Sequence, residues 1–511
     1  MNFPLWSPLR YLPAWGNPRP AATASWYQVA ILATAGLFLA AAAATVATEV
    51  SADETTTRRP NVIFILTDDQ GYGDLSCHGN PILRTPQLDR LHAESVRFVD
   101  FQVSPTCSPT RSALLTGRHE FRNGITHTIL ERERLALDSI TLPQVLQSAG
   151  YQTGIFGKWH LGDEDEYLPN RRGFSEIFIH GAGGIGQSYP GSCGDAPGNT
   201  YFDPAIWHND KFVKTKGYCT DVFFAQATRW IDSVAGRQPF FCYIALNAPH
   251  APLDVPPEYE QRYAGQVPRN AARFFGMIAN IDDNVGRLLD HLRSAGLERD
   301  TLVIFMNDNG GTAGVPVFNA GMRGTKGTAW LGAIRASSFW RWPGQLTPAD
   351  VPALAAHLDF FPTLAELTGA TLDEAARRQI EGRSLVPLLK NPQAAWPDRT
   401  LFTHLGRWPK GANPQEFKYV QCSVRTTRWH LVSDAQRKST LPATPTWQLF
   451  DLTADRGEQQ DVAAAHPEVV RDLSQQYDTW WDSVQPRLVN EAAVGPEQNS
   501  FKVRYERQFG K

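Results

Sequence analysis

Two pairs of polar residues stand directly after apolar runs of the sequence. Asp68 and Asp69 follow the first run, and Asp308 and Asn309 follow a much later one. Three carboxylates and an amide oxygen are hard ligands, and a set with neither imidazole nor thiolate favours Ca²⁺ or Mg²⁺ over zinc. One such pair alone more often caps a turn or a helix. Two pairs at equivalent strand ends predict a metal site.

A cysteine lies between these pairs, within residues 105–118, which read Pro-Thr-Cys-Ser-Pro-Thr-Arg-Ser-Ala-Leu-Leu-Thr-Gly-Arg. Pro109 suits the first turn of a helix, so Cys107 is predicted at a helix N-terminus, where free N–H groups and the helix dipole favour an anion. Arg111, one turn later, adds a charge whose fork geometry suits anionic oxygens. A cysteine taken alone is more often a small buried apolar residue.

Basic and imidazole groups follow two other apolar runs. Lys158 and His160 come just after residues 153–157, and His250 comes just after residues 240–247. Ligands bind at the carboxyl ends of the strands in an open α/β sheet, so these groups are expected in one crevice. Each residue alone would more often be an ordinary histidine or a solvated lysine. Together with Cys107, Arg111 and the two polar pairs, they supply a nucleophile, a group that activates it, cations that bind an anion, and metal ligands.

The apolar runs predict buried strands at residues 61–67, 153–157, 240–247 and 301–307. Helical patterns alternate with them at residues 87–97, 142–149, 221–234 and 273–294. This alternation predicts an α/β fold with a large, mostly parallel sheet flanked by helices. Gly and Pro punctuate residues 181–204, where we expect a long functional loop.

The pattern of apolar residues in the sequence changes after about residue 392. Strand-like spacing at residues 419–432 and 446–452 precedes an amphipathic helical pattern at residues 467–481. We therefore expect a catalytic domain over residues 53–392 and a small C-terminal α+β subdomain over residues 393–511.

Residues 1–52 have the composition of an export signal. The first 25 residues contain Arg10 and Arg19 but no acidic residue, and an almost uninterrupted apolar run covers residues 29–47. Small residues before Asp53 suit a signal peptidase. The run is long for a cleaved signal, so an uncleaved membrane anchor stays open as an alternative. We expect an exported protein, periplasmic or secreted, that meets a membrane only through such an anchor.

The composition limits the partners. The 511 residues include 49 Lys and Arg and 52 Asp and Glu, with no basic block of the kind that follows nucleic-acid phosphates, so we expect no nucleic-acid partner. Among the six cysteines, Cys193 and Cys219 flank a Gly- and Pro-rich stretch and either form a disulfide or remain thiols. Cys77 and Cys242 are interpreted as structural.

The stretch around Cys107 resembles the signature of the formylglycine sulfatases, in which a Cys followed by x-Pro-x-Arg is oxidised to an aldehyde. Residues 150–160 resemble a second signature of that family, with Phe156 where a smaller residue is usual. The resemblance extends from residue 60 to about residue 480, and it includes residues 324–327, 357–363 and 449–452. It implies an alkaline-phosphatase-like fold and an arylsulfatase-type enzyme.

The resemblance also implies roles for individual residues. Arg111 and Lys158 would stabilise a hydrated aldehyde, His160 would accept its proton, and His250 and Lys326 would grip the sulfate and help the leaving oxygen depart. One hydroxyl of the hydrate would attack sulfur, and loss of a proton from the other would expel sulfate. One divalent cation, usually Ca²⁺ with Mg²⁺ as the alternative, would be held by Asp68, Asp69, the modified Cys107, Asp308 and Asn309.

The implied partners are a sulfated small molecule or glycan and a formylglycine-generating or equivalent maturation enzyme. The sequence departs from the family after Lys326, where Leu331, Gly332, Ala333, Arg335 and Ser337 replace a usual Glu, Gly-Gly and Arg-x-Pro. This departure affects the expected substrate fit more than the chemistry. Two alternatives stay open: a phosphonate or phosphate monoester hydrolase of the same superfamily, and a catalytically silent glycan-binding relative.

Overall fold

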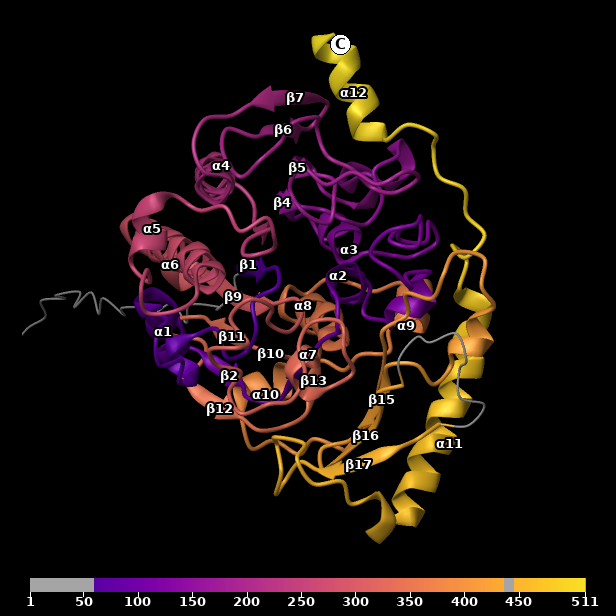
Figure 1. Cartoon of the computed structure of the whole chain (residues 1–511). Helices are drawn as coiled ribbons and strands as arrows, with labels where there is room; N and C mark the ends of the chain where they lie inside the picture. Colours follow the sequence, from indigo (N-terminus) through magenta and orange to yellow (C-terminus); the bar gives the residue numbers. More distant parts are fainter. Residues whose placement is uncertain (1–58, 436–444, 511) are drawn as a thin grey trace, which may run out of the picture. The chain divides into compact units, whose positions relative to one another are not determined.

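The centre of the protein is a sheet of ten strands, seen in a computed structural model that describes residues 59–435 and 445–510 (Figure 1). Within those two ranges, no helix is long and apolar enough to cross a membrane. The expected export signal or anchor at residues 1–52 lies outside the described residues.

Five neighbouring strands in the middle of this sheet run parallel. In spatial order they are β9 (Thr301–Asn307), β1 (Asn61–Thr67), β8 (Phe240–Ala245), β4 (Gln152–Lys158) and β5 (Glu176–His180). Their carboxyl ends therefore meet at one edge, and this arrangement confirms the predicted fold class.

Short strands extend the sheet on both sides, mostly by antiparallel pairing. On the β9 side these are β11 (Ser338–Arg341), β2 (Val96–Phe98) and β12 (Ala349–Val351), and on the β5 side they are β6 (Ala205–His208) and β7 (Lys211–Lys214). A separate three-stranded sheet contains β10 (Arg335–Ala336), β3 (Phe101–Gln102) and β13 (Ala355–Ala356).

Both faces of the central sheet are buried because alternate side chains of each strand enter different cores. In β1, Val62 and Phe64 join one apolar cluster, whereas Ile63 and Ile65 join another. The first cluster includes side chains from α2 (Cys107–Thr116), α3 (Leu142–Ser148), α8 (Phe360–Leu367) and α10 (Val386–Lys390). The second includes side chains from α1 (Pro86–Ala93), α4 (Cys219–Val234), α5 (Pro257–Gln261) and α6 (Arg269–Ser294). The shorter helices α7 (Leu331–Ile334) and α9 (Glu374–Gln379) lie in connections.

The C-terminal part forms a four-stranded antiparallel sheet with a long helix beside it (Figure 1). Its elements are β14 (Leu401–His404), β15 (Cys422–Arg425), β16 (Trp429–Ser433), β17 (Gln448–Asp451) and α11 (Pro467–Val484). A buried ion pair of 2.6 Å joins Arg425 of β15 to Asp100 of the main domain. The last helix, α12 (Ser500–Phe509), instead hydrogen-bonds to Phe212 of β7 through Gln508. The domain boundary at residue 392 stays a prediction.

Two local expectations change. The helix expected over residues 87–97 ends at Ala93, because Val96 and Arg97 pair with β11 as strand β2. Cys193 and Cys219 are both free thiols and not a disulfide. Each is buried with a polar neighbour, since Cys193 Sγ accepts from the backbone of Gly162 and Cys219 faces Asn247.

Candidate active site

Three carboxylates meet where β1 and β9 end. Asp68 and Asp69 follow β1, Asp308 and Asn309 follow β9, and all four side chains are buried. One oxygen from each of the three carboxylates lies within 4.8 Å of the other two. The parallel pairing of β1 with β9 puts the two polar pairs side by side although they are far apart in the sequence.

Each of these carboxylates faces its own cation. Lys158, the last residue of β4, approaches Asp68 with 2.6 Å between Nζ and Oδ2. Lys326 Nζ lies 2.5 Å from an oxygen of Asp69. Two nitrogens of Arg111, on α2, donate to Oδ2 of Asp308 at 2.9 and 3.0 Å. The cluster is therefore held by ion pairs from β4, from α2 and from the connection after β9.

Burial and neighbouring charges shift the pKa values of Asp68 and Asp308 in opposite directions. Burial acts to raise the pKa of Asp68, but Lys158, His250 and Arg111 together outweigh it, so that pKa lies below its ordinary value. Burial and the Asp68 carboxylate raise the pKa of Asp308 well above its ordinary value despite the contact with Arg111. Three acids so close together resist simultaneous ionisation, and a divalent cation between them would relieve the repulsion.

Two buried oxygens of the cluster fit a metal ion. Asp68 Oδ1 and Asn309 Oδ1 have no hydrogen-bond partner among the described residues. Buried polar atoms are normally paired, so two unpaired acceptors in adjacent strand-end segments fit a bound cation. The donors are carboxylate and amide oxygens, the ligands that Ca²⁺ and Mg²⁺ prefer.

Cys107 is the first residue of α2, as the position of Pro109 predicts, and it is buried. No side chain caps this end of the helix, so its free N–H groups remain available to an anion. Burial acts to raise the pKa of the Cys107 thiol, but Lys158 and Lys326 outweigh it and leave the pKa below its ordinary value. Residue 107 thus sits in a positively polarised position.

His160 is oriented as a proton acceptor toward Cys107. Its Nε2 lies 2.8 Å from the carbonyl oxygen of Thr128 and must carry the hydrogen of that bond. In the neutral ring Nδ1 is then the free acceptor, and it lies 3.6 Å from Cys107 Sγ. Burial lowers the pKa of His160 well below its ordinary value, which keeps the ring neutral.

His250 faces Asp69 of the carboxylate cluster. Its Nδ1 lies 2.7 Å from the carbonyl oxygen of Ala251, so Nδ1 carries a hydrogen, and Nε2 lies 3.8 Å from Asp69 Oδ2. Two glycines allow both histidines to fit. A Cβ added to Gly183 would lie 2.8 Å from the ring of His160, and one added to Gly184 would lie 2.9 Å from His250.

A pocket of about 300 Å³ opens over these groups. It brings together four predicted site residues: Cys107, His160, His250 and Lys326. It is completed by residues that sequence patterns did not single out, namely His127, Thr128, Ile129, Gly183, Gln187, Tyr189 and Arg407. Three of these, Gly183, Gln187 and Tyr189, belong to the loop expected at residues 181–204. Arg407 comes from the C-terminal part, and no sequence signal placed it here.

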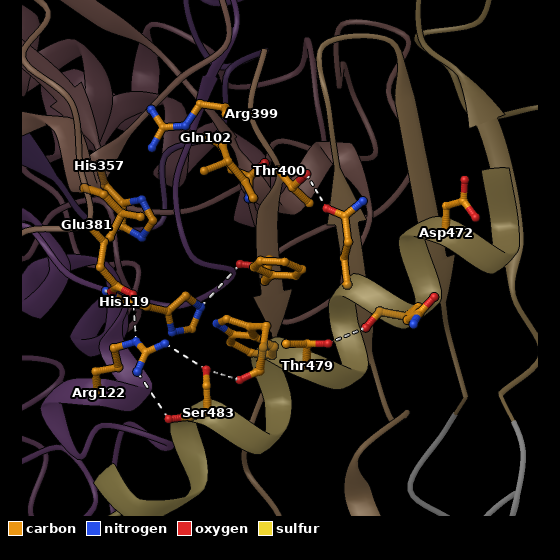
Figure 2. Close-up of a pocket in the computed structure, with 16 residues that line it drawn as sticks. Gln102, His119, Arg122, His357, Glu381, Arg399, Thr400, Asp472, Thr479 and Ser483 are labelled. Carbon is orange, nitrogen blue, oxygen red and sulfur yellow. Dashed lines mark hydrogen bonds and ion pairs between the residues drawn. The ribbon is translucent and has the colours of Figure 1, made fainter. Parts of the chain in front are cut away.

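A larger pocket, with a volume of about 830 Å³, lies elsewhere (Figure 2). It lies between the main domain and α11, and several of its polar groups contact one another. Arg122 contacts Glu381 and Ser483, and Thr400 donates to Gln476. None of the predicted catalytic or metal-binding residues lines it, so chemistry and not size locates the candidate active site.

The segment that departs from the family pattern is buried beside the strand ends. Gly332 donates to the carbonyl of Arg323, and the carbonyl of Ala333 accepts from Gly310, directly after Asn309. Arg335 lies over the ring of Tyr72 at 3.8 Å. None of these residues lines the 300 Å³ pocket. The segment instead contacts the backbone that follows β9.

Comparisons with known proteins point to one family of enzymes. A family model described as Sulfatase matches residues 60–370. Human arylsulfatase A is 32% identical over 470 aligned residues, which cover 82% of this chain and 87% of that protein. The crystal structure of Ps i-CgsB in complex with k-i-k-neocarrahexaose has a TM-score of 0.73 and 26% identity, covering 86% of this chain and 95% of that chain. The phosphonate monoester hydrolase of Agrobacterium radiobacter shares the fold, with a TM-score of 0.58 and 19% identity over 84% of this chain and 96% of that chain.

We expect Asp68→Asn and Asp308→Asn each to lower turnover at least about 100-fold, since even changes behind a metal ligand cost 10- to 100-fold. Bound Ca²⁺, measured by elemental analysis, should fall in parallel. Asp163→Asn is the matched control, because Asp163 is also a buried acid but bonds Gly194 and Asn499 outside the cluster. Near-normal turnover with unchanged metal content in both variants would exclude this ligand set.

Proposed function

Because the chain belongs to the sulfatase family, we propose that it hydrolyses a sulfate monoester with a formylglycine made from Cys107 and one bound Ca²⁺, or Mg²⁺ in its place. Asp68, Asp69, Asp308, Asn309 and residue 107 would hold the cation. The cation would supply positive charge that stabilises the anionic ester.

The charge balance of the buried cluster carries this proposal. When a bound divalent cation keeps all three carboxylates ionised, their charges balance those of the three cations that they face. A divalent cation would leave the site positive, among side chains that are largely buried. A sulfate monoester is an anion that resists attack, and fixed positive charge at low dielectric lowers the barrier to bringing a nucleophile near it.

The chain's own residues then have separate tasks. Arg111 and Lys158 fix the carboxylates and polarise residue 107, while His160 accepts a proton from it through Nδ1. Formylglycine would supply a hydrated aldehyde, in which one hydroxyl attacks sulfur and the other later loses its proton to expel sulfate. Lys326 and His250, both lining the pocket, hold the sulfate group and protonate the leaving oxygen.

We propose an aryl or carbohydrate sulfate as the substrate. The side chain of Tyr189 is at the pocket and 42% exposed, and Gln187 lies beside it in the lining. An aromatic face with a nearby amide suits a sugar or aryl ring. The solved structure with k-i-k-neocarrahexaose bound also supports a saccharide. We further propose that the chain is exported and matured by a formylglycine-generating or equivalent enzyme.

The rival with a specific observation in its favour is a phosphonate or phosphate monoester hydrolase, since a phosphonate monoester hydrolase shares the fold. An assay on matched aryl sulfate, phosphonate and phosphate esters distinguishes the two functions. It uses the matured protein, with the Cys107→Ala variant as the control. We expect the highest kcat/KM on the sulfate and its loss in the control. A preference for the phosphonate or phosphate would favour the rival, and glycan binding without any turnover would favour a silent relative.

His250→Ala should slow substrates with poor leaving groups more than activated aryl sulfates, because a proton donor matters most when the departing oxygen is basic. We expect at least about tenfold more loss of kcat on a sugar sulfate than on a nitrophenyl sulfate, given that general acids contribute roughly 100-fold or more. His208→Ala is the control, since His208 pairs with Glu176 away from the pocket. Equal losses on both substrates would remove His250 from the acid role.

A further inference from the structure

A second group of possible metal ligands lies outside the candidate active site. One ligand atom each from Cys77, His78 and His92 lies within 4.8 Å of the other two, and all three residues are partly exposed. Cys77 and His78 end a short 3-10 helix, Ser76–His78, and His92 lies in the last turn of α1. None of the three lines the 300 Å³ pocket. We propose that these side chains bind one Zn²⁺ ion.

The donor types distinguish this group from the oxygen cluster. A thiolate and two imidazoles are borderline to soft ligands, which select Zn²⁺ over Ca²⁺ or Mg²⁺. Three protein ligands leave the fourth tetrahedral position to water, as in other three-ligand zinc sites. The partial exposure of all three residues gives the ion a route from solvent.

A hydrogen bond fixes the tautomer of His78 in the form that a metal ligand needs. Its Nδ1 lies 2.7 Å from the carbonyl oxygen of Tyr72, so Nδ1 carries the hydrogen and Nε2 keeps a free lone pair. A zinc-bound histidine usually donates a hydrogen bond from its other ring nitrogen to a carbonyl, carboxylate or water. The ring also stacks on Tyr72, with centroids 3.8 Å apart and planes 11° from parallel.

His92 and Cys77 complete the donor set. Across residues 59–435 and 445–510, neither ring nitrogen of His92 takes part in a hydrogen bond, although its ring meets Phe339 edge-on at 5.0 Å. Burial lowers the pKa of both His78 and His92, so both rings are neutral ligands at physiological pH. Burial and the neighbouring Asp89 raise the pKa of Cys77, so Zn²⁺ must displace the thiol proton, which leaves to solvent.

Such an ion would tie two segments together. The loop from Tyr72 to His78 follows directly after Asp68 and Asp69, and His92 belongs to a helix on the second core. Bound Zn²⁺ therefore stabilises the segment that follows the carboxylate cluster. This inference does not depend on the proposed sulfatase chemistry.

Cobalt is the probe, because a thiolate bound to Co²⁺ absorbs strongly while an all-oxygen site does not. Full-length Cys107→Ser protein is titrated with Co²⁺ in excess Ca²⁺, so that residue 107 offers no thiolate and the oxygen cluster is filled. We expect a thiolate-to-cobalt charge-transfer band and tetrahedral ligand-field bands that saturate at one Co²⁺ per chain. One equivalent of Zn²⁺ should abolish them.

Two further variants in the same background test the ligands. Cys77→Ser should lose the charge-transfer band, and His92→Gln should weaken Co²⁺ binding about tenfold or more. His466→Gln is the control, since His466 is a partly exposed histidine beside Glu468 and far along the sequence. Zn²⁺ should also raise the midpoint of thermal unfolding of the Cys107→Ser protein but not of the Cys77→Ser variant. Absence of the band in the Cys107→Ser protein, or its persistence after Cys77→Ser, would overturn the proposal.

Discussion

Three buried carboxylates share a space in which their oxygens lie within 4.8 Å of one another, and the surrounding structure compensates each of them with one cation. An unpaired buried charge costs several kcal/mol, so this cluster is stable only if all three cations are delivered together. Lys158 arrives on β4, Arg111 on α2, and Lys326 in a connection after β9. The parallel order of the central strands is what brings these elements to one edge.

The same arrangement explains the position of residue 107. Because Arg111 must reach Asp308 from α2, the first turn of that helix lies against the cluster, and Cys107 is placed at its open N-terminus. His160 follows Lys158 by two residues and turns back with a positive φ of 58° to face Cys107. Positive φ is uncommon for residues other than glycine, and such backbone outliers concentrate at functional sites.

The residues of this edge could be predicted because each follows a strongly apolar strand. Strands β1 and β9 begin and end at the predicted residues, because every residue of each run is buried. The pairing of each carboxylate with a particular cation could not be predicted, because Asp69 and Lys326 are brought together only by the tertiary fold.

Short flanking strands such as β2 were also missed, because three residues carry too little pattern, and their pairing with β11 decides their conformation. The same limit applies to the pocket and to the group around His78. Arg407 reaches the pocket from beyond residue 392, and Cys77 approaches His92 only when the 3-10 helix packs against α1. Contacts of this kind depend on packing between elements and leave no local signal in the sequence.

The central claim is that residue 107 acts as an aldehyde, and the mass of one peptide tests it most directly. The tryptic peptide spanning residues 98–111, taken from an active preparation, should be lighter than its sequence by the difference between H₂S and O. Its aldehyde should react with a hydrazide probe, and the modified fraction should rise in proportion to specific activity across preparations. An active preparation whose peptide contains only intact, alkylatable Cys107 would contradict the account.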